Sequence, residues 1–155
     1  MKELHKNNNI LEESEEINYI FQTFNAEKAY KIGSYIAEKA INEGYRLSVE
    51  IVVNNKLLFH FSTDTSTSDT NRWIKRKLNT VYHFQTSTKS LLKKNKGNED
   101  ILYSKYRLDL KEVTLTPGGF PIHVKGIGVI GAIAVSGLEP LQDHEMILEA
   151  IKQHL

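Results

Sequence analysis

The stretch that most constrains the fold is residues 116–137, TPGGFPIHVKGIGVIGAIAVSG, which combines a turn signal with the most apolar run of the chain. Pro117-Gly118-Gly119 marks a turn, and four more glycines follow at positions 126, 128, 131 and 137. Glycine inside a strand indicates a bulge or the close approach of another backbone or a ligand. The stretch therefore predicts a central, buried strand pair that is kinked at glycine.

Three of these glycines match the GxGxxG pattern of dinucleotide-binding proteins. That pattern requires a strand directly before the glycines and a helix directly after them. The residues after Gly131 are only Ala132–Val135, and the run ends at Ser136-Gly137. Because this segment is too short for the required helix, the pattern does not indicate a nucleotide site.

Length and composition are those of one ordinary globular domain, with 155 residues, 40% hydrophobic and 25% charged. The chain has no cysteine, which excludes disulfides, thiolate metal sites and a cysteine nucleophile. Its N-terminus lacks the apolar core of a signal peptide, and its longest apolar run is about half a membrane span. We expect a cytoplasmic protein without membrane contact, with a flexible terminus at residues 1–11 and one domain at residues 12–155.

Hydrophobic periodicity assigns most of the remaining chain. Helices are predicted over residues 12–24, 26–43, 71–94, 101–108 and 140–155. Residues 47–61 alternate around Asn54-Asn55, which predicts a β-hairpin with a tight turn. A weaker alternation over residues 110–115 predicts an edge strand.

The helix from residue 71 carries a basic cluster in its first turns, where the helix dipole disfavours cations. Arg72, Lys75, Arg76 and Lys77 form the cluster, and Trp73 lies among them. The placement suggests an anionic partner for these charges. Nucleic acid is not expected, because the net charge is only +1 and no nucleic-acid module is recognisable.

Six histidines occur without the spacing of a zinc site, so no metal centre is predicted. His123 and Lys125 occupy alternate positions after the glycine turn, where both could face a cleft. His144 follows Asp143 in the first turn of the last helix. Either histidine could be a general base or a haem ligand, and the alternative is a hydrogen-bonded structural or surface histidine.

Two blocks of the sequence resemble a known family. The first runs from Asp69 to Val81 with Phe84 beyond it, and the second runs from Gly118 through Gly137 and closes at Asp143-His144. With the preceding helix and hairpin they are similar to small cytosolic proteins related to the haem-degrading-domain, or haem-binding and glycolate-cluster-G-like, proteins. The resemblance covers nearly all of residues 12–155.

This resemblance implies an α+β fold in one domain. Its central antiparallel sheet would have about five strands, with helices packed on it in a profilin-like layering. It also implies a homo-oligomer, dimeric at least, and some relatives bind haem. No haem axial ligand can be carried over to a position of this chain.

Three functions stay open at this stage. One is a small-molecule-binding oligomer for haem or another anionic, partly aromatic ligand. Another is an enzyme of the haem-degrading-domain type that uses His123 and Lys125. The last is a protein-interaction scaffold whose basic helix docks an acidic client. The candidate ligand-binding residues are Trp73, Arg76, Lys77, Phe120, His123 and Lys125, with haem as the candidate cofactor.

Overall fold

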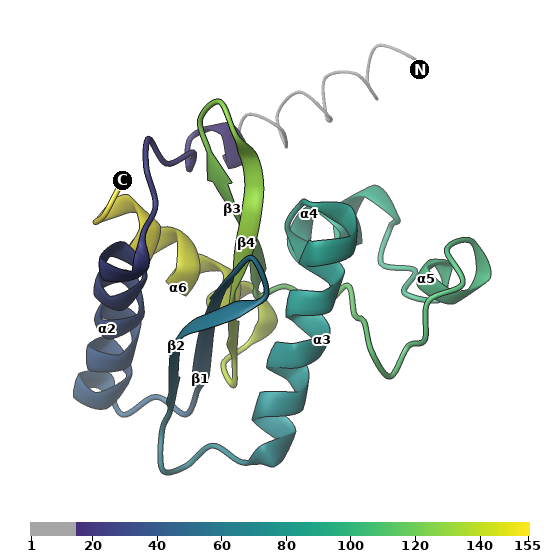
Figure 1. Cartoon of the computed structure of the whole chain (residues 1–155). Helices are drawn as coiled ribbons and strands as arrows, with labels where there is room; N and C mark the ends of the chain where they lie inside the picture. Colours follow the sequence, from purple (N-terminus) through teal and green to yellow (C-terminus); the bar gives the residue numbers. More distant parts are fainter. Residues whose placement is uncertain (1–14) are drawn as a thin grey trace.

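A four-stranded antiparallel sheet with helices on both faces organises the chain in a computed structural model that describes residues 15–155 (Figure 1). The elements are α2 (Ala26–Glu43), β1 (Ser48–Val53), β2 (Lys56–Ser62), α3 (Ser68–Phe84), α4 (Thr88–Lys94), α5 (Ile101–Ser104), β3 (Gly119–Val124), β4 (Gly128–Ser136) and α6 (Pro140–Lys152). The strand order is β2-β1-β4-β3. The predicted α+β fold is confirmed, with four strands among the described residues rather than about five.

The hairpin predicted over residues 47–61 is confirmed as β1 and β2. Asn54 and Asn55 have φ angles of 51° and 63°. A two-residue turn of this kind requires positive φ at both positions, and asparagine tolerates that conformation better than most residues. β2 lies at one edge of the sheet.

Residues 116–137 form β3 and β4, as predicted for a strand pair, and β4 lies between β1 and β3. β3 is the other edge strand, where Pro121 is tolerated because it has no N–H to donate. Gly131 is the predicted point of close approach. A Cβ there would overlap the carbonyl oxygen of Val52 and lie 2.9 Å from the Cα of Val53.

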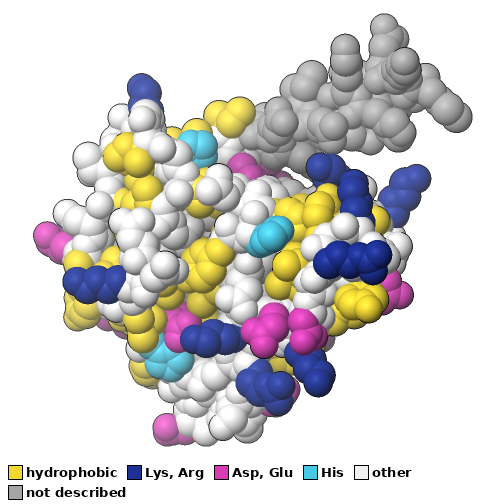
Figure 2. Space-filling view, turned by 45° about the vertical axis from the view of Figure 1, so that its right-hand side comes forward, with side chains coloured by type: hydrophobic (Ala, Val, Ile, Leu, Met, Phe, Trp, Pro, Cys, Tyr) yellow, Lys and Arg dark blue, Asp and Glu magenta, His cyan; other side chains and the backbone are white. Residues whose placement is uncertain are grey.

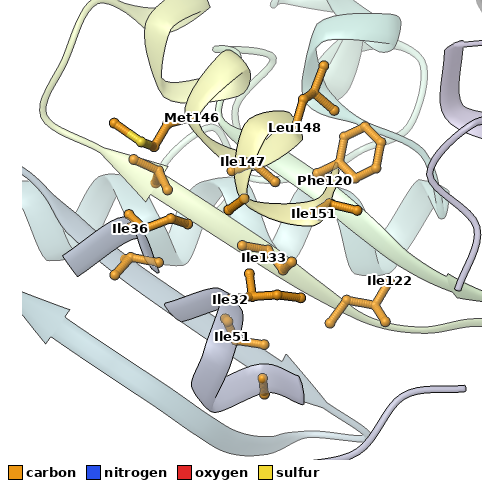
Figure 3. Close-up of a cluster of buried hydrophobic side chains, with 14 of the residues drawn as sticks. Ile32, Ile36, Ile51, Phe120, Ile122, Ile133, Met146, Ile147, Leu148 and Ile151 are labelled. Atoms are coloured by element: carbon orange, nitrogen blue, oxygen red, sulfur yellow. The ribbon is translucent and has the colours of Figure 1, made fainter. Parts of the chain in front are cut away.

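The main hydrophobic core lies between the sheet and the helix pair α2 and α6 (Figure 3). Its buried side chains come mainly from both helices and three strands. Figure 3 labels Ile32 and Ile36 of α2, Ile51 of β1, Phe120 and Ile122 of β3, Ile133 of β4, and Met146, Ile147, Leu148 and Ile151 of α6. Burial of this apolar surface fixes the packing of these elements.

A second core lies on the opposite face of the sheet, where α3 packs on β1 and β4. Ile74, Leu78 and Val81 provide the helix side of this contact. On the strand side two of the three residues are alanines, Ala132 and Ala134. The apolar side of α3 therefore packs on the sheet, and other residues of this helix remain available to form a site.

The helix predicted over residues 12–24 is wrong for residues 18–24. Residues 12–14 lie outside the described part, as does the predicted flexible terminus at residues 1–11. Phe21 forms a parallel bridge to Val124 of β3. Its N–H donates to His123 O at 2.8 Å, and its side chain is fully buried. Pairing with the edge of β3 outweighs the helical spacing of the apolar residues.

Three other element predictions are corrected. The helix predicted over residues 71–94 is interrupted, because Gln85 takes φ 56° and Ser87 starts α4 as its N-cap. α5 ends at Ser104, well before residue 108. Residues 110–115 are not a strand, since Val113 and Leu115 instead pack with Leu91 and Leu102 in a third cluster. None of the helices within residues 15–155 is long and apolar enough to cross a membrane.

Replacing Gly131 by alanine should destabilise the fold by about 3 kcal/mol, because the new Cβ overlaps the β1 backbone in the interior of the sheet. Gly126→Ala is the matched control. Gly126 also needs a positive φ, 78°, but has open space around it, so its loss should be about 1 kcal/mol. Urea unfolding followed by circular dichroism measures both, and equal losses would contradict the role assigned to Gly131.

Candidate functional site

A buried ion pair joins the two faces of the sheet at the point where β4 ends. The Nζ of Lys77, on α3, lies 3.1 Å from Oδ2 of Asp143, on α6. The same ammonium group donates to the carbonyl oxygen of Val135 at 2.8 Å. Both side chains are only 2% exposed. The pair therefore lies in the interior although both residue types are normally found at the surface.

The glycine turn leaves the space that this pair occupies. Gly118 has φ 122°, and a Cβ there would lie 2.6 Å from Lys77 Nζ and 3.0 Å from the Cβ of Asp143. The N–H of Leu138 donates to Oδ1 of Asp143 at 3.0 Å and holds the carboxylate. The turn that dominates the sequence pattern thus creates the cavity for the buried charges.

Burial changes the proton affinity of both partners. It lowers the pKa of Lys77, and the nearby Asp143 carboxylate only partly offsets this effect. It also raises the pKa of Asp143 to about 6, against the opposing effect of Lys77 and of two backbone N–H groups. A pair with such shifts beside a cleft is a candidate for proton transfer as well as for structure.

A cleft of 410 Å³ opens beside the pair. Trp73 and Asp69 of α3 form one wall, and Ser136, Leu138 and Pro140 form the other. The cleft also reaches Lys77 and Asp143 themselves. The buried charges therefore lie beside an open cleft although their own exposure is small.

A larger cleft of 610 Å³ lies on the outer side of Trp73. The Arg76 guanidinium lies 4.3 Å from the centroid of the Trp73 ring, in a cation–π contact. Arg76 also lies 3.7 Å from a Glu99 oxygen and donates to Val113 O. The full lining is Asp69, Arg72, Trp73, Arg76, Tyr103, Asp109, Leu110 and Lys111. Figure 2 shows basic and acidic side chains side by side on one face of the molecule rather than one basic field.

The six sequence-predicted residues fall into three places. Trp73, Arg76 and Lys77 share α3, and the two clefts connect them. Phe120 lies across the sheet, 1% exposed, with its ring 5.7 Å from that of Tyr19. It belongs to the core with α2 and α6.

His123 and Lys125 lie near the hairpin end of β3, and the strand's other end approaches Lys77. At about 3.3 Å per residue, His123 is roughly 13 Å along the strand from Gly119. Their backbones pair with that of Phe21. The N–H of Phe21 donates to His123 O, and the N–H of Lys125 donates to Phe21 O. The structure therefore does not bring these two residues to the Trp73 clefts.

His144 is buried, 1% exposed, and neither ring nitrogen has a hydrogen-bond partner among the described residues. Its Nε2 lies 3.6 Å from a Glu15 oxygen, and its ring lies 5.8 Å from that of Phe120. Burial, with a further contribution from Lys89, lowers the pKa of His144. The side chain lines neither Trp73 cleft, and its neutral form suits the core.

Several site residues were not singled out from the sequence. Tyr103 and Lys111 come from segments with no motif, and they join the outer cleft only through the folding of residues 95–115 over α3. Asp143 was noted beside His144, but its partner Lys77 is 66 positions away. Among residues 15–155 no three histidine or acidic side chains converge on a position that could hold a metal ion.

Comparison with known proteins gives one family match. A family model described as haem degrading protein HbpS-like matches residues 24–152. A UPF0303 protein of Brucella anthropi is 35% identical over 136 residues, which cover 88% of this chain and 80% of the relative. A UPF0303 protein of Brucella canis is 36% identical over 137 residues with the same coverage.

Solved structures share the fold. The crystal structure of the Ybr137w protein has a TM-score of 0.82 at 24% identity and covers 92% of this chain and 85% of its own. A double mutant of HbpS from Streptomyces reticuli gives 0.67 at 21% identity, with coverage of 84% and 86%. The PduOC:haem complex gives 0.66 at 19% identity, with coverage of 86% and 94%.

Lys77→Met should cost about 3–5 kcal/mol of stability, because it leaves the Asp143 carboxylate buried without a cation. The double variant Lys77→Met with Asp143→Asn should lose less stability than Lys77→Met alone. The asparagine amide keeps an oxygen acceptor for the Leu138 N–H and carries no uncompensated charge. A double-mutant cycle by urea unfolding at pH 7 measures the coupling, and additive losses would show that the pair is not coupled.

The stability loss in Lys77→Met should increase with pH. Without Lys77, the folded-state pKa of Asp143 stays above the ordinary carboxyl value, so the folded state binds the proton more tightly than the unfolded state. Because Lys77 lowers the pKa of Asp143, which is about 6 in the wild type, that pKa is higher in Lys77→Met, and the loss relative to the wild type grows as the pH rises above about 6. The double variant, which lacks the carboxyl group, should show no such increase. A loss in Lys77→Met that does not vary with pH would contradict the assignment.

Proposed function

Because the chain belongs to the HbpS-like family of haem degrading proteins, we propose that it binds a flat, anionic ligand of the tetrapyrrole class, with haem as the first candidate. The PduOC:haem complex has the same fold and supports this choice of ligand class. The location proposed for the ligand rests on the stack of the Arg76 guanidinium on the Trp73 ring, 4.3 Å from its centroid, inside the 610 Å³ cleft.

The residues of the outer cleft fit such a ligand. Trp73 offers an aromatic surface for the ring system. Arg72, Arg76 and Lys111 are cations that can meet the ligand's carboxylates, and they outnumber the two acids of the lining. The cleft volume lies within the range of about 300–1,000 Å³ usual for small-molecule sites. Lys77 is excluded from this role because Asp143 already neutralises it.

Tyr103 is the candidate for contact with the metal of a haem. Its side chain is 59% exposed and lines the same cleft. A phenol oxygen is one of the established axial ligands of haem iron. Bound haem would supply iron-based redox chemistry, while the protein would supply the binding surface, the charges and the oxygen ligand.

Haemin titration tests this proposal. The wild-type chain should give a saturable shift of the Soret band, and Trp73→Ala should weaken binding by about 10-fold through lost stacking. Tyr103→Phe should change the position of the band with little change in affinity. Ile127→Ala, at an exposed residue of the β3–β4 turn outside the cleft, is the control and should leave both unchanged. The proposal fails if stoichiometric haemin gives no saturable shift, or if Trp73→Ala binds like the wild type.

Homo-oligomer formation is part of the same proposal. Tyr30 and Ile41 on α2 are 64% and 63% exposed, and Leu57 on the edge strand β2 is 54% exposed. Exposed apolar side chains beside an open sheet edge favour association with another chain. These residues are candidates for the contact between subunits.

Light scattering after size-exclusion chromatography should give a mass of at least two chains at micromolar concentration. Leu57→Lys should shift the distribution toward the monomer, because it places a charge at the sheet edge. Ile127→Lys, at a 72% exposed residue in the β3–β4 turn, serves as the control and should have no effect. A wild-type chain that is monomeric at every concentration would overturn this part of the proposal.

A further inference from the structure

A polar cluster lies on the α3-facing side of the β1–β2 hairpin, beyond the apolar contact with α3. In the strand register Glu50 is opposite His60, and Ser48 is opposite Ser62. Because strand side chains alternate between the two faces, all four point to the same side of the sheet. Asn71 of α3 reaches this side, where its Oδ1 lies 3.3 Å from Ser62 Oγ.

Three of these side chains are arranged as nucleophile, base and acid. Ser62 Oγ lies 3.0 Å from Nε2 of His60, and Nδ1 of His60 lies 3.2 Å from Oε1 of Glu50. This is the order of contacts in serine hydrolases, which recurs on unrelated folds and is recognised by geometry. We propose that Ser62, His60 and Glu50 form a catalytic triad for the hydrolysis of small carboxylic esters.

The hydrogen bonds of the cluster fix the direction of proton movement. An ionised Glu50 can only accept, so Nδ1 of His60 carries the ring hydrogen and Nε2 is left as an acceptor. Ser62 then donates its single hydroxyl hydrogen to Nε2. The buried Ser48 hydroxyl, 2.9 Å away, can donate to a lone pair of Ser62 Oγ. In this arrangement the Ser62 hydroxyl hydrogen goes to His60 Nε2 rather than to Asn71 Oδ1, the competing acceptor at 3.3 Å, and Ser62 can transfer its proton to His60.

Two neighbouring features bear on how an ester could bind at Ser62. The Asn71 amide can present its NH2 group instead of its oxygen after rotation about its last torsion, which provides a donor for an oxyanion next to Ser62. A cleft of 220 Å³ lined by Glu50, Lys75 and Tyr82, among others, adjoins the acid end of the triad. Neither Ser62 nor His60 lines this cleft, so an ester would reach Ser62 from the solvent-exposed side of His60.

The reaction balances without a cofactor. Ser62 Oγ attacks the ester carbonyl carbon while its proton passes to His60 Nε2. The tetrahedral intermediate expels the alcohol, which takes that proton from His60, and an acyl-serine remains. Water then attacks the acyl-serine, gives its proton to His60, and releases the carboxylic acid as the proton returns to Ser62. The net change is ester plus water to acid plus alcohol.

Covalent labelling of the full chain with a fluorophosphonate, read by peptide mass spectrometry, tests the proposal. Ser62 should be the modified residue, and Ser62→Ala should abolish the label. His60→Gln should slow labelling by at least 100-fold, because the general base is lost. Glu50→Gln should slow it by about 10-fold or more. p-Nitrophenyl acetate hydrolysis should fall in the same order.

Ser104→Ala, at an exposed serine of α5 outside the cluster, is the matched control and should label and hydrolyse like the wild type. Urea unfolding of each variant checks that the hairpin is intact, and the His60 and Glu50 variants retain Ser62 itself. Absence of a label on Ser62 in the wild type would overturn the proposal. Equal labelling of Ser62 in the wild type and in His60→Gln would overturn it as well.

Discussion

The contact between Lys77 and Asp143 is the interaction on which the arrangement of the layers depends. α3 and α6 lie on opposite faces of the sheet, and this ion pair links them past the end of β4. Removing two charges from water is costly, and mutual attraction compensates only when the geometry is good and the remaining polar groups are bonded. Val135 O and the Leu138 N–H meet that condition. The first turn of α6 is therefore fixed relative to α3.

That interaction explains why the glycine-rich stretch dominates the sequence. Gly118 leaves room for the buried charges, and Gly131 lets the β1 backbone approach β4. Gly126 and Gly128 lie at the β3–β4 turn with positive φ. The match to GxGxxG is therefore a coincidence of three separate packing and turn requirements. Each requirement is local: Gly131 allows β1 to approach β4, and Gly126 and Gly128 shape the β3–β4 turn.

Local signals were sufficient for part of the fold and of the candidate site. Periodicity and caps predicted α2 and the β1–β2 hairpin, because those elements depend on neighbours in sequence. Phe21 and residues 110–115 were assigned wrongly, since long-range burial decides their conformation. Trp73 and Arg76 were singled out because they lie in a basic cluster in the first turns of the helix, and their side chains stack in the structure. Contacts such as Glu50 with His60 depend on strand register, which alternation alone does not determine.

The two Trp73 clefts differ in how their charges are used, and this difference decides where an anion can bind. In the 410 Å³ cleft beside the ion pair, Lys77 is buried and already paired with Asp143. An anionic ligand there would compete with Asp143 and bring a further negative charge beside it. In the outer cleft Arg72 and Lys111 are exposed, and Arg76 keeps its guanidinium on the Trp73 ring. Attraction there is weakened by salt because the cations face water. Trp73 thus separates a cleft with an internally neutralised lysine from one whose cations remain open to a ligand.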